Sequence, residues 1–111
     1  MKLTSPSTKK CDTVLKAILL RNPILLDVRT HTEYVGCHLP NSRNITPCEI
    51  PSRLAEIKSW NKPVVVYSQY GLRSKLAYKI LKRAKIEVYD ACSKTKVASS
   101  LVNFESTLVV K

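Results

Sequence analysis

The part of the sequence best suited to chemistry is segment 68–74, which reads Ser-Gln-Tyr-Gly-Leu-Arg-Ser. It lies between an apolar run and a basic helical pattern, so its backbone N–H groups and the positive end of the next helix are expected to converge. Arg73 adds a planar set of donors that suits an oxyanion, and Gly71 permits a backbone conformation that other residues resist. We therefore predict an anion cradle with Ser68 at its entrance. The other members of the predicted cradle are Gln69, Tyr70, Leu72 and Ser74.

From composition alone, an ordinary strand-to-helix loop explains this segment equally well. In that interpretation Gly71 serves the turn and Ser74 caps the following helix. Asp27 and Arg29, which stand near the end of another apolar run, are expected to orient neighbouring loops.

The four cysteines lie far apart and form no C-x-x-C pair: Cys11, Cys37, Cys48 and Cys92. Zinc sites usually contain at least one such close pair, so no metal site is expected. Cys92 follows an expected strand at the same sheet edge as Ser68, which makes it a candidate thiol near the cradle. A small buried cysteine is the commoner explanation of such a residue, and it applies to Cys37 as well.

The charge balance favours an anionic partner. Nineteen Lys and Arg stand against eight acids, a formal net charge of +11. Nucleic acid, an acidic protein surface and a small oxyanion all fit that balance. Sequence-specific reading of RNA or DNA is poorly supported, because no aromatic side chains interleave the basic ones. The expected helix over 74–85 could dock an acidic protein or tRNA, or could simply be a solvated face. Its basic positions are Lys75, Lys79, Lys82 and Arg83.

The length of 111 residues predicts a single domain over 1–111. The longest wholly apolar stretches, 17–20 and 64–67, are far too short to span a membrane, and segment 1–10 has no apolar core of a secretory signal. We therefore expect no membrane association, reduced thiols and a cytoplasmic location.

Hydrophobic periodicity predicts alternating strands and helices. Strands are expected at 24–28, 42–45, 63–67 and 86–89, and extended chain at 107–110. Helices are expected after a cap at Asp12, at 31–35, from Pro51, at 74–85 and at 97–102. This alternation favours an α/β fold, a parallel sheet of about four or five strands flanked by helices on both faces.

Several short motifs, in this order and spacing, resemble the single-domain rhodanese family of sulfurtransferases. The resemblance is clearest over 11–90. Its motifs are Leu-Leu-Asp-Val-Arg at 25–29, Glu33-Tyr34, His38-Leu39-Pro40, Asn44-Ile45, Val-Val-Val-Tyr at 64–67 and Gly-Leu-Arg-Ser at 71–74.

The resemblance implies a single rhodanese-like domain with a persulfide mechanism. In that family a cysteine heads the active loop, at the position held here by Ser68. Its thiolate takes the outer sulfur of thiosulfate, sulfite leaves, and cyanide or another thiol collects the sulfur. The loop amides lower the thiol pKa and hold the anion. The resemblance implies no metal or organic cofactor, and it gives His38 a structural hydrogen bond. For the basic face of the helix over 74–85 it implies docking of an acidic sulfur-relay protein or tRNA.

The sequence departs from the family pattern at the nucleophile. Ser68 cannot form a persulfide, and neither histidine is expected to reach it as a base. Cys37, Asn41 and the pair Ala91-Cys92 stand where the family usually has glycine. Cys92 is therefore also a candidate displaced thiol near the cradle. We therefore predict a domain that keeps the loop, has lost sulfur transfer, and binds an anion or a partner. The alternatives are a working sulfurtransferase carrying a Cys-to-Ser substitution at position 68, and a basic module that binds nucleic acid or an acidic protein.

Overall fold

The centre of the fold is a run of valines that forms a fully buried strand. The computed structural model describes residues 15–69 and 71–101. Within them, β3 (Val64–Ser68) is buried at every position, as expected where helices cover both faces of a parallel sheet. It pairs with β1 (Ile24–Asp27) on one side and with β4 (Val88–Ser93) on the other. β2 (Ser42–Asn44) adds to the far side of β1 and completes a four-stranded, wholly parallel sheet in the order β2-β1-β3-β4.

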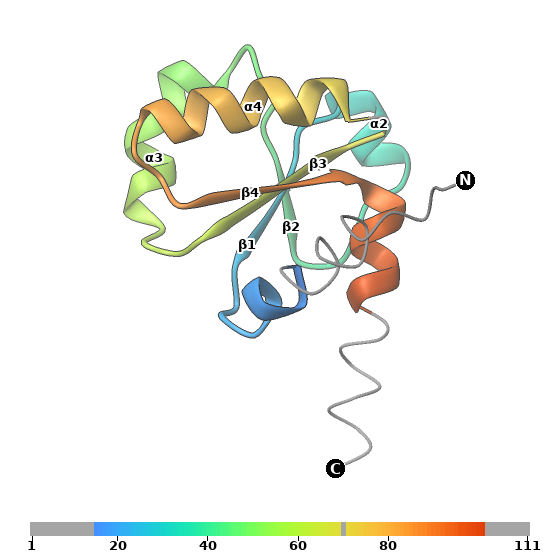
Figure 1. Ribbon diagram of the computed structural model, residues 1–111. Coiled ribbons are helices and arrows are strands. Elements are labelled where there is room, and N and C mark those ends of the chain that lie inside the picture. Colours follow the sequence, from blue (N-terminus) through green and yellow to red (C-terminus); the bar gives the residue numbers. More distant parts are fainter. Residues whose placement is uncertain (1–14, 70, 102–111) are drawn as a thin grey trace, which may run out of the picture.

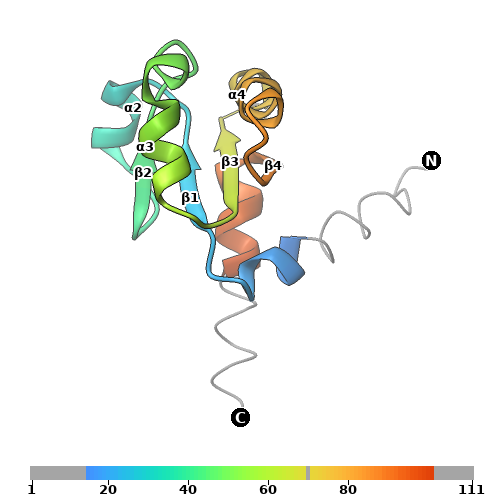
Figure 2. The same cartoon turned by 90° about the vertical axis from the view of Figure 1, so that its left-hand side faces the viewer.

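Helices cover both faces of this sheet (Figures 1 and 2). One face carries the short 3-10 helix η1 (Ile50–Arg53), α3 (Leu54–Ser59) and α4 (Leu72–Arg83). The other face carries the helical segments 15–19 and 94–101. A further helix, α2 (His31–Gly36), follows the carboxyl end of β1. The structure thus confirms the expected α/β architecture, with four strands in the part of the chain that it describes.

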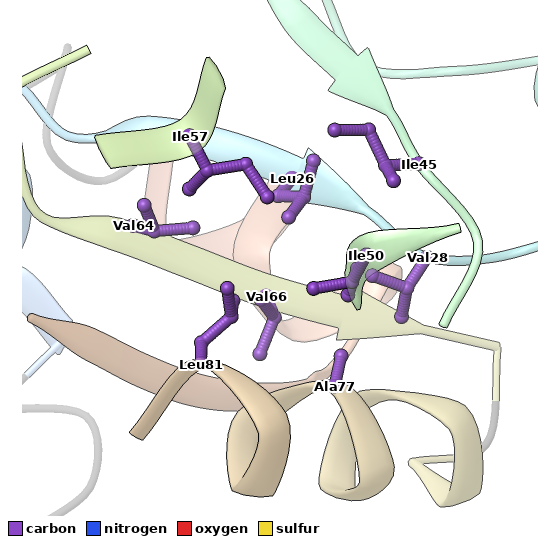
Figure 3. Packing of buried hydrophobic residues seen from close by; sticks show 9 residues of the cluster. All are labelled: Leu26, Val28, Ile45, Ile50, Ile57, Val64, Val66, Ala77 and Leu81. Atoms are coloured by element: carbon purple, nitrogen blue, oxygen red, sulfur yellow. The ribbon is translucent and has the colours of Figure 1, made fainter. Parts of the chain in front are cut away.

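Two apolar clusters lie on opposite faces of the sheet because successive strand side chains point in opposite directions. Leu26, Val64 and Val66 belong to the cluster under α3 and α4. In Figure 3, Ala77 and Leu81 of α4 point from their helix toward this sheet face. The second cluster takes the alternate strand positions, among them Leu25, Val65 and Tyr67, and packs against 15–19 and 94–101.

Three of the helices differ from the expected ones in where they begin or in their type. The helix expected from Pro51 begins as the 3-10 turn η1 and becomes α-helical only at Leu54. The helix expected at 74–85 begins at Leu72, because Gly71 takes a left-handed conformation (φ 91°) and serves as the N-cap. The helix expected at 97–102 already begins at residue 94.

The strand expected at 86–89 is also wrong in its bounds. β4 begins at Val88 and runs to Ser93 through a register shift, beyond which Tyr67 pairs with Cys92 and Ser68 with Ser93. Pairing with the central strand extends β4 through polar residues that carry no strand signal of their own. Asp12 and the segment 107–110 lie outside the described residues.

Between residues 15 and 101, residue 70 apart, no helix is long and apolar enough to cross a bilayer.

Candidate functional site

Ser68 lies at the floor of the loop between β3 and α4. It is the last residue of β3 and is completely buried. Its Oγ accepts hydrogen bonds from the backbone N–H of Gly71 (3.0 Å) and of Ser74 (3.4 Å). The expectation that Ser68 stands at the entrance is therefore wrong: β3 ends under the first turn of α4, and this turn covers the hydroxyl.

Two other residues shape the loop around Ser68. Gly71 needs its positive φ, and behind it lies Cys92, whose Cβ would be 3.8 Å from a Cβ built on the glycine. The hydroxyl of Ser74 lies 3.0 Å from the Gly71 carbonyl oxygen and 3.4 Å from that of Cys92. Ser74 therefore joins the first turn of α4 to the end of β4. It is not the N-cap, which is Gly71.

Arg73 is bound to an acid from another element. Its Nη1 donates to Glu33 Oε1 at 2.8 Å and its Nη2 lies 3.5 Å from Oε2, while about a third of the Arg73 side chain stays exposed. Glu33 also accepts from Thr30 in a capping box at the start of α2. The hydrogen bond from Arg73, reinforced by Thr30, lowers the pKa of Glu33 to about 2. Glu33 thus belongs to the site, although it is not among the predicted site residues. The sequence signal that could have indicated it is the pattern Thr30-x-x-Glu33, which is typical of a capping box.

Asp27 and Arg29 form a buried ion pair at the end of β1. Asp27 accepts from the Arg29 backbone N–H at 2.9 Å, from Nε at 3.0 Å and from Nη2 at 2.8 Å. The same Nη2 donates to the carbonyl oxygen of Cys37 at 2.7 Å. The pair therefore ties the end of β1 to the loop after α2.

The two histidines are engaged away from Ser68. The His38 ring stacks on Tyr34 with centroids 4.0 Å apart, and its Nδ1 donates to the Tyr34 carbonyl oxygen at 2.8 Å. His31 contacts Asn44 and Glu49, and the hydrogen bond to Asn44, followed by that to Glu49, raises its pKa. Within the described chain, the hydrogen bonds to the Ser68 hydroxyl come from backbone amides, and no titratable side chain acts as its base.

The described cysteines are exposed, so the interpretation of Cys37 and Cys92 as small buried residues is wrong. Cys92 takes a positive φ of 70° at the register shift of β4, where its N–H donates to Asp90. Its side chain is exposed there and lies beside Gly71. Cys37 lies near Lys94, with 3.2 Å between Nζ and Sγ. Among the described residues no group of three potential metal-binding side chains is found.

The remaining loop positions are placed as follows. Gln69 and Leu72 are exposed, Leu72 to 81%, and Tyr70 lies outside the described residues. Directly before the loop, Tyr67 is fully buried, and its hydroxyl lies near the Ser42 side chain without a hydrogen bond of normal geometry in the described part of the chain. Burial raises the pKa of Tyr67 above its ordinary value.

Comparisons with known proteins agree with this architecture. The sequence model of a family described as "Rhodanese-like domain" matches residues 12–93. The protein titled "Uncharacterized protein YqhL" from Bacillus subtilis (strain 168) is 35% identical over 71 residues, which cover 63% of this chain and 56% of that protein. The chain thus spans little more than half the length of this curated relative.

A solved structure is also similar. The structure titled "Crystal structure of reduced Bacillus anthracis CoADR-RHD" matches with a TM-score of 0.65 and 23% identity over 83% of this chain and 16% of that one. Identity at this level shows a common fold.

Proposed function

The chain belongs to the rhodanese-like domain family, and from this membership we propose that it binds a small oxyanion such as thiosulfate at the loop after β3 without transferring sulfur through position 68. The observation that carries the proposal is the state of Ser68, a buried hydroxyl that accepts two backbone hydrogen bonds. A persulfide needs an S–S bond, which an oxygen nucleophile cannot form. A serine hydroxyl also needs an adjacent base to ionise at neutral pH, and the described residues provide none.

The first turn of α4 retains groups that bind anions. The first N–H groups of a helix lack intrahelical acceptors, and the helix dipole places positive potential there. The amide of Ser74 is used by Ser68, whereas those of Leu72 and Arg73 have no acceptor within residues 15–69 and 71–101. The guanidinium of Arg73 has five N–H donors, and Glu33 accepts only two of them. These donors support an anion site at the mouth of the loop, above the buried hydroxyl.

Titration calorimetry with thiosulfate tests the binding part of the proposal. Arg73→Gln should weaken binding by about tenfold, the loss expected for a charge-assisted hydrogen bond. The matched control is Lys75→Gln, which removes an equal charge from the same helical turn and should change the affinity by less than about threefold. Equal losses in both variants, or no binding to the unaltered protein, would contradict an anion site at the loop.

A thiosulfate:cyanide sulfurtransferase assay tests the catalytic part. We expect no turnover above background, and no added sulfur atom in the intact mass after incubation with thiosulfate. Added sulfur that disappears in Cys92→Ser would assign a persulfide to the exposed thiol beside Gly71. The domain would then be a sulfurtransferase with a displaced nucleophile, and the proposal would be wrong.

In a second candidate function, the chain is a sulfurtransferase whose catalytic cysteine has been replaced by serine at position 68. The hydrogen bonds to Ser68 Oγ favour this candidate, since two amides aimed at this atom would also stabilise a thiolate. In Ser68→Cys the thiolate would attack the outer sulfur of thiosulfate, the S–S bond of thiosulfate would break, and sulfite would leave with the electron pair. Cyanide would then take the outer sulfur as thiocyanate and regenerate the thiolate.

The Ser68→Cys variant has a close control in Ser93→Cys. Ser93 pairs with Ser68 in the sheet register and also accepts from a helix N–H, that of Lys96. Activity in Ser68→Cys alone would favour the second candidate. If neither folded variant shows sulfurtransferase activity, the loop does not support sulfur transfer, and anion binding remains as its function.

A further inference from the structure

An apolar groove runs along the flank of α4, away from the loop at its N-terminal end. It has a volume of about 500 Å³ and lies between α4 and the first residue of α3. Its lining residues are Leu54, Leu76, Lys79, Ile80, Arg83 and Ala84. Leu76 is 51% exposed, although it is a large apolar side chain.

The residues of α4 form two parallel rows along this groove. Positions four apart lie above one another on a helix. Leu76 and Ile80 therefore form an apolar row that Ala84 continues just beyond the helix end. Lys75, Lys79 and Arg83 form a basic row beside it, and the last two also line the groove. The basic row is about 12 Å long at 1.5 Å per residue.

The basic row has no acidic partner within the described chain. The ion pairs in the described residues hold five of the eight acids of the sequence, and each of these acids is paired with an arginine or a histidine outside the basic row. None of these pairs includes Lys75, Lys79 or Arg83. The groove therefore combines an apolar floor with cationic charge that no described acid neutralises.

We propose that this groove docks an acidic amphipathic helix of a partner protein. Apolar side chains of the partner helix would cover Leu76 and Ile80, and its carboxylates, spaced one turn apart, would pair with Lys79 and Arg83. Helix-in-groove binding requires apolar anchors on one helix face with charges beside them. The groove has the complementary arrangement, an apolar floor with basic side chains beside it.

Charge and chemistry argue against other occupants. A second copy of this chain carries the same net charge of +11, so its approach is opposed by repulsion. RNA would place phosphates over the aliphatic floor, and single-stranded RNA prefers aromatic stacking surfaces, which the groove residues do not include. The proposal does not depend on the anion site, which lies at the N-terminal end of the same helix.

The test uses a labelled peptide of about four helical turns, with glutamates on one face and leucines on the other, and follows its binding by fluorescence anisotropy. The double variant Lys79→Glu/Arg83→Glu should weaken binding at least tenfold, and Leu76→Ser should weaken it by about fivefold. The matched control is Lys58→Glu/Lys62→Glu, two exposed lysines outside the groove. It makes the same change in net charge and should stay within about twofold of the unaltered protein.

Further controls separate groove binding from general attraction. A scrambled peptide of the same composition should bind at least tenfold more weakly, and thermal unfolding should show every variant folded. The proposal is wrong if both charge reversals weaken binding equally, if the scrambled peptide binds as well, or if a single-stranded RNA binds at the same residues and excludes the peptide. The thiosulfate affinity should not change in the groove variants, so failure here is distinguishable from failure of the anion site.

Discussion

The carboxyl edge of the sheet and the groove on α4 use polar groups in opposite ways. At the sheet edge two ion pairs form within the chain: Asp27 binds Arg29, and Glu33 binds Arg73. Along the groove, Lys79 and Arg83 belong to none of the ion pairs found in the described residues. The first arrangement stabilises the fold, whereas the second leaves charge available to a partner. Substitutions at the edge should therefore change stability, with Arg73 affecting anion binding as well, whereas substitutions in the groove should change binding to a partner alone.

Asp27→Ala should give the largest loss of stability. It leaves the guanidinium of Arg29 buried without a counter-charge, which typically costs about 3–5 kcal/mol of the free energy of unfolding. Urea denaturation measures the loss. Glu56→Ala, which breaks the exposed pair with Arg53, should cost less than about 1 kcal/mol. Similar losses in the two variants would mean that the buried pair stabilises the fold no more than the exposed pair does.

Ser68→Ala should cost about 1–3 kcal/mol, because the amides of Gly71 and Ser74 lose a buried acceptor. Urea denaturation measures this loss as well. The control is Ser52→Ala, whose exposed hydroxyl donates only to the Glu49 carbonyl oxygen, with an expected change within about 0.5 kcal/mol. A neutral Ser68→Ala would show that another group satisfies the loop amides.

Tyr67→Phe should raise the free energy of unfolding by about 1 kcal/mol. It removes a buried hydroxyl that has no hydrogen-bond partner among the described residues, and such a group carries a desolvation cost. Tyr34→Phe provides the opposite case, since the Tyr34 hydroxyl donates to the Ser42 carbonyl oxygen at 2.6 Å. Tyr34→Phe should lower the free energy of unfolding by about 1 kcal/mol. A loss in Tyr67→Phe as well would reveal a partner for its hydroxyl.

The ion pair between Glu33 and Arg73 should make stability depend on pH below about 4.5. The pKa of Glu33 falls from 4.5 to about 2 on folding, so its stabilising contribution is complete above 4.5 and is lost as the pH falls through 2. The midpoint temperature of thermal unfolding should therefore fall less steeply between pH 6 and pH 2 in Glu33→Gln than in the unaltered protein. Parallel declines would mean that the pair does not persist in solution.

The double variant Lys79→Ser/Arg83→Ser should have the smallest effect on folding. Neither side chain has an acidic partner in the described chain, so the free energy of unfolding should change by less than about 0.5 kcal/mol. The thermal midpoint measures this change. A larger loss would show that the basic row stabilises the domain itself, and the contrast with the sheet edge would disappear.

The resemblance read from the short motifs is confirmed for the family and for the fold. The predicted alternation of strands and helices also agrees with the structure, because each element depends on the spacing of apolar residues within one short segment. The three valines of β3 and the apolar face of α4 are patterns of this kind. The end of β4 is the exception, since Asp90, Cys92 and Ser93 join the sheet by pairing with a strand about 25 residues earlier.

The sequence by itself determined the order of the elements, the position of the loop after β3 and the excess of positive charge. The tertiary structure decided which atoms of that loop are reachable. It buried Ser68 under the first turn of α4, joined Arg73 to an acid 40 residues away, and left Cys92 exposed beside Gly71. The reason is physical: apolar periodicity is a property of neighbouring residues, whereas burial and ion pairing depend on distances between segments that only the packed sheet brings together.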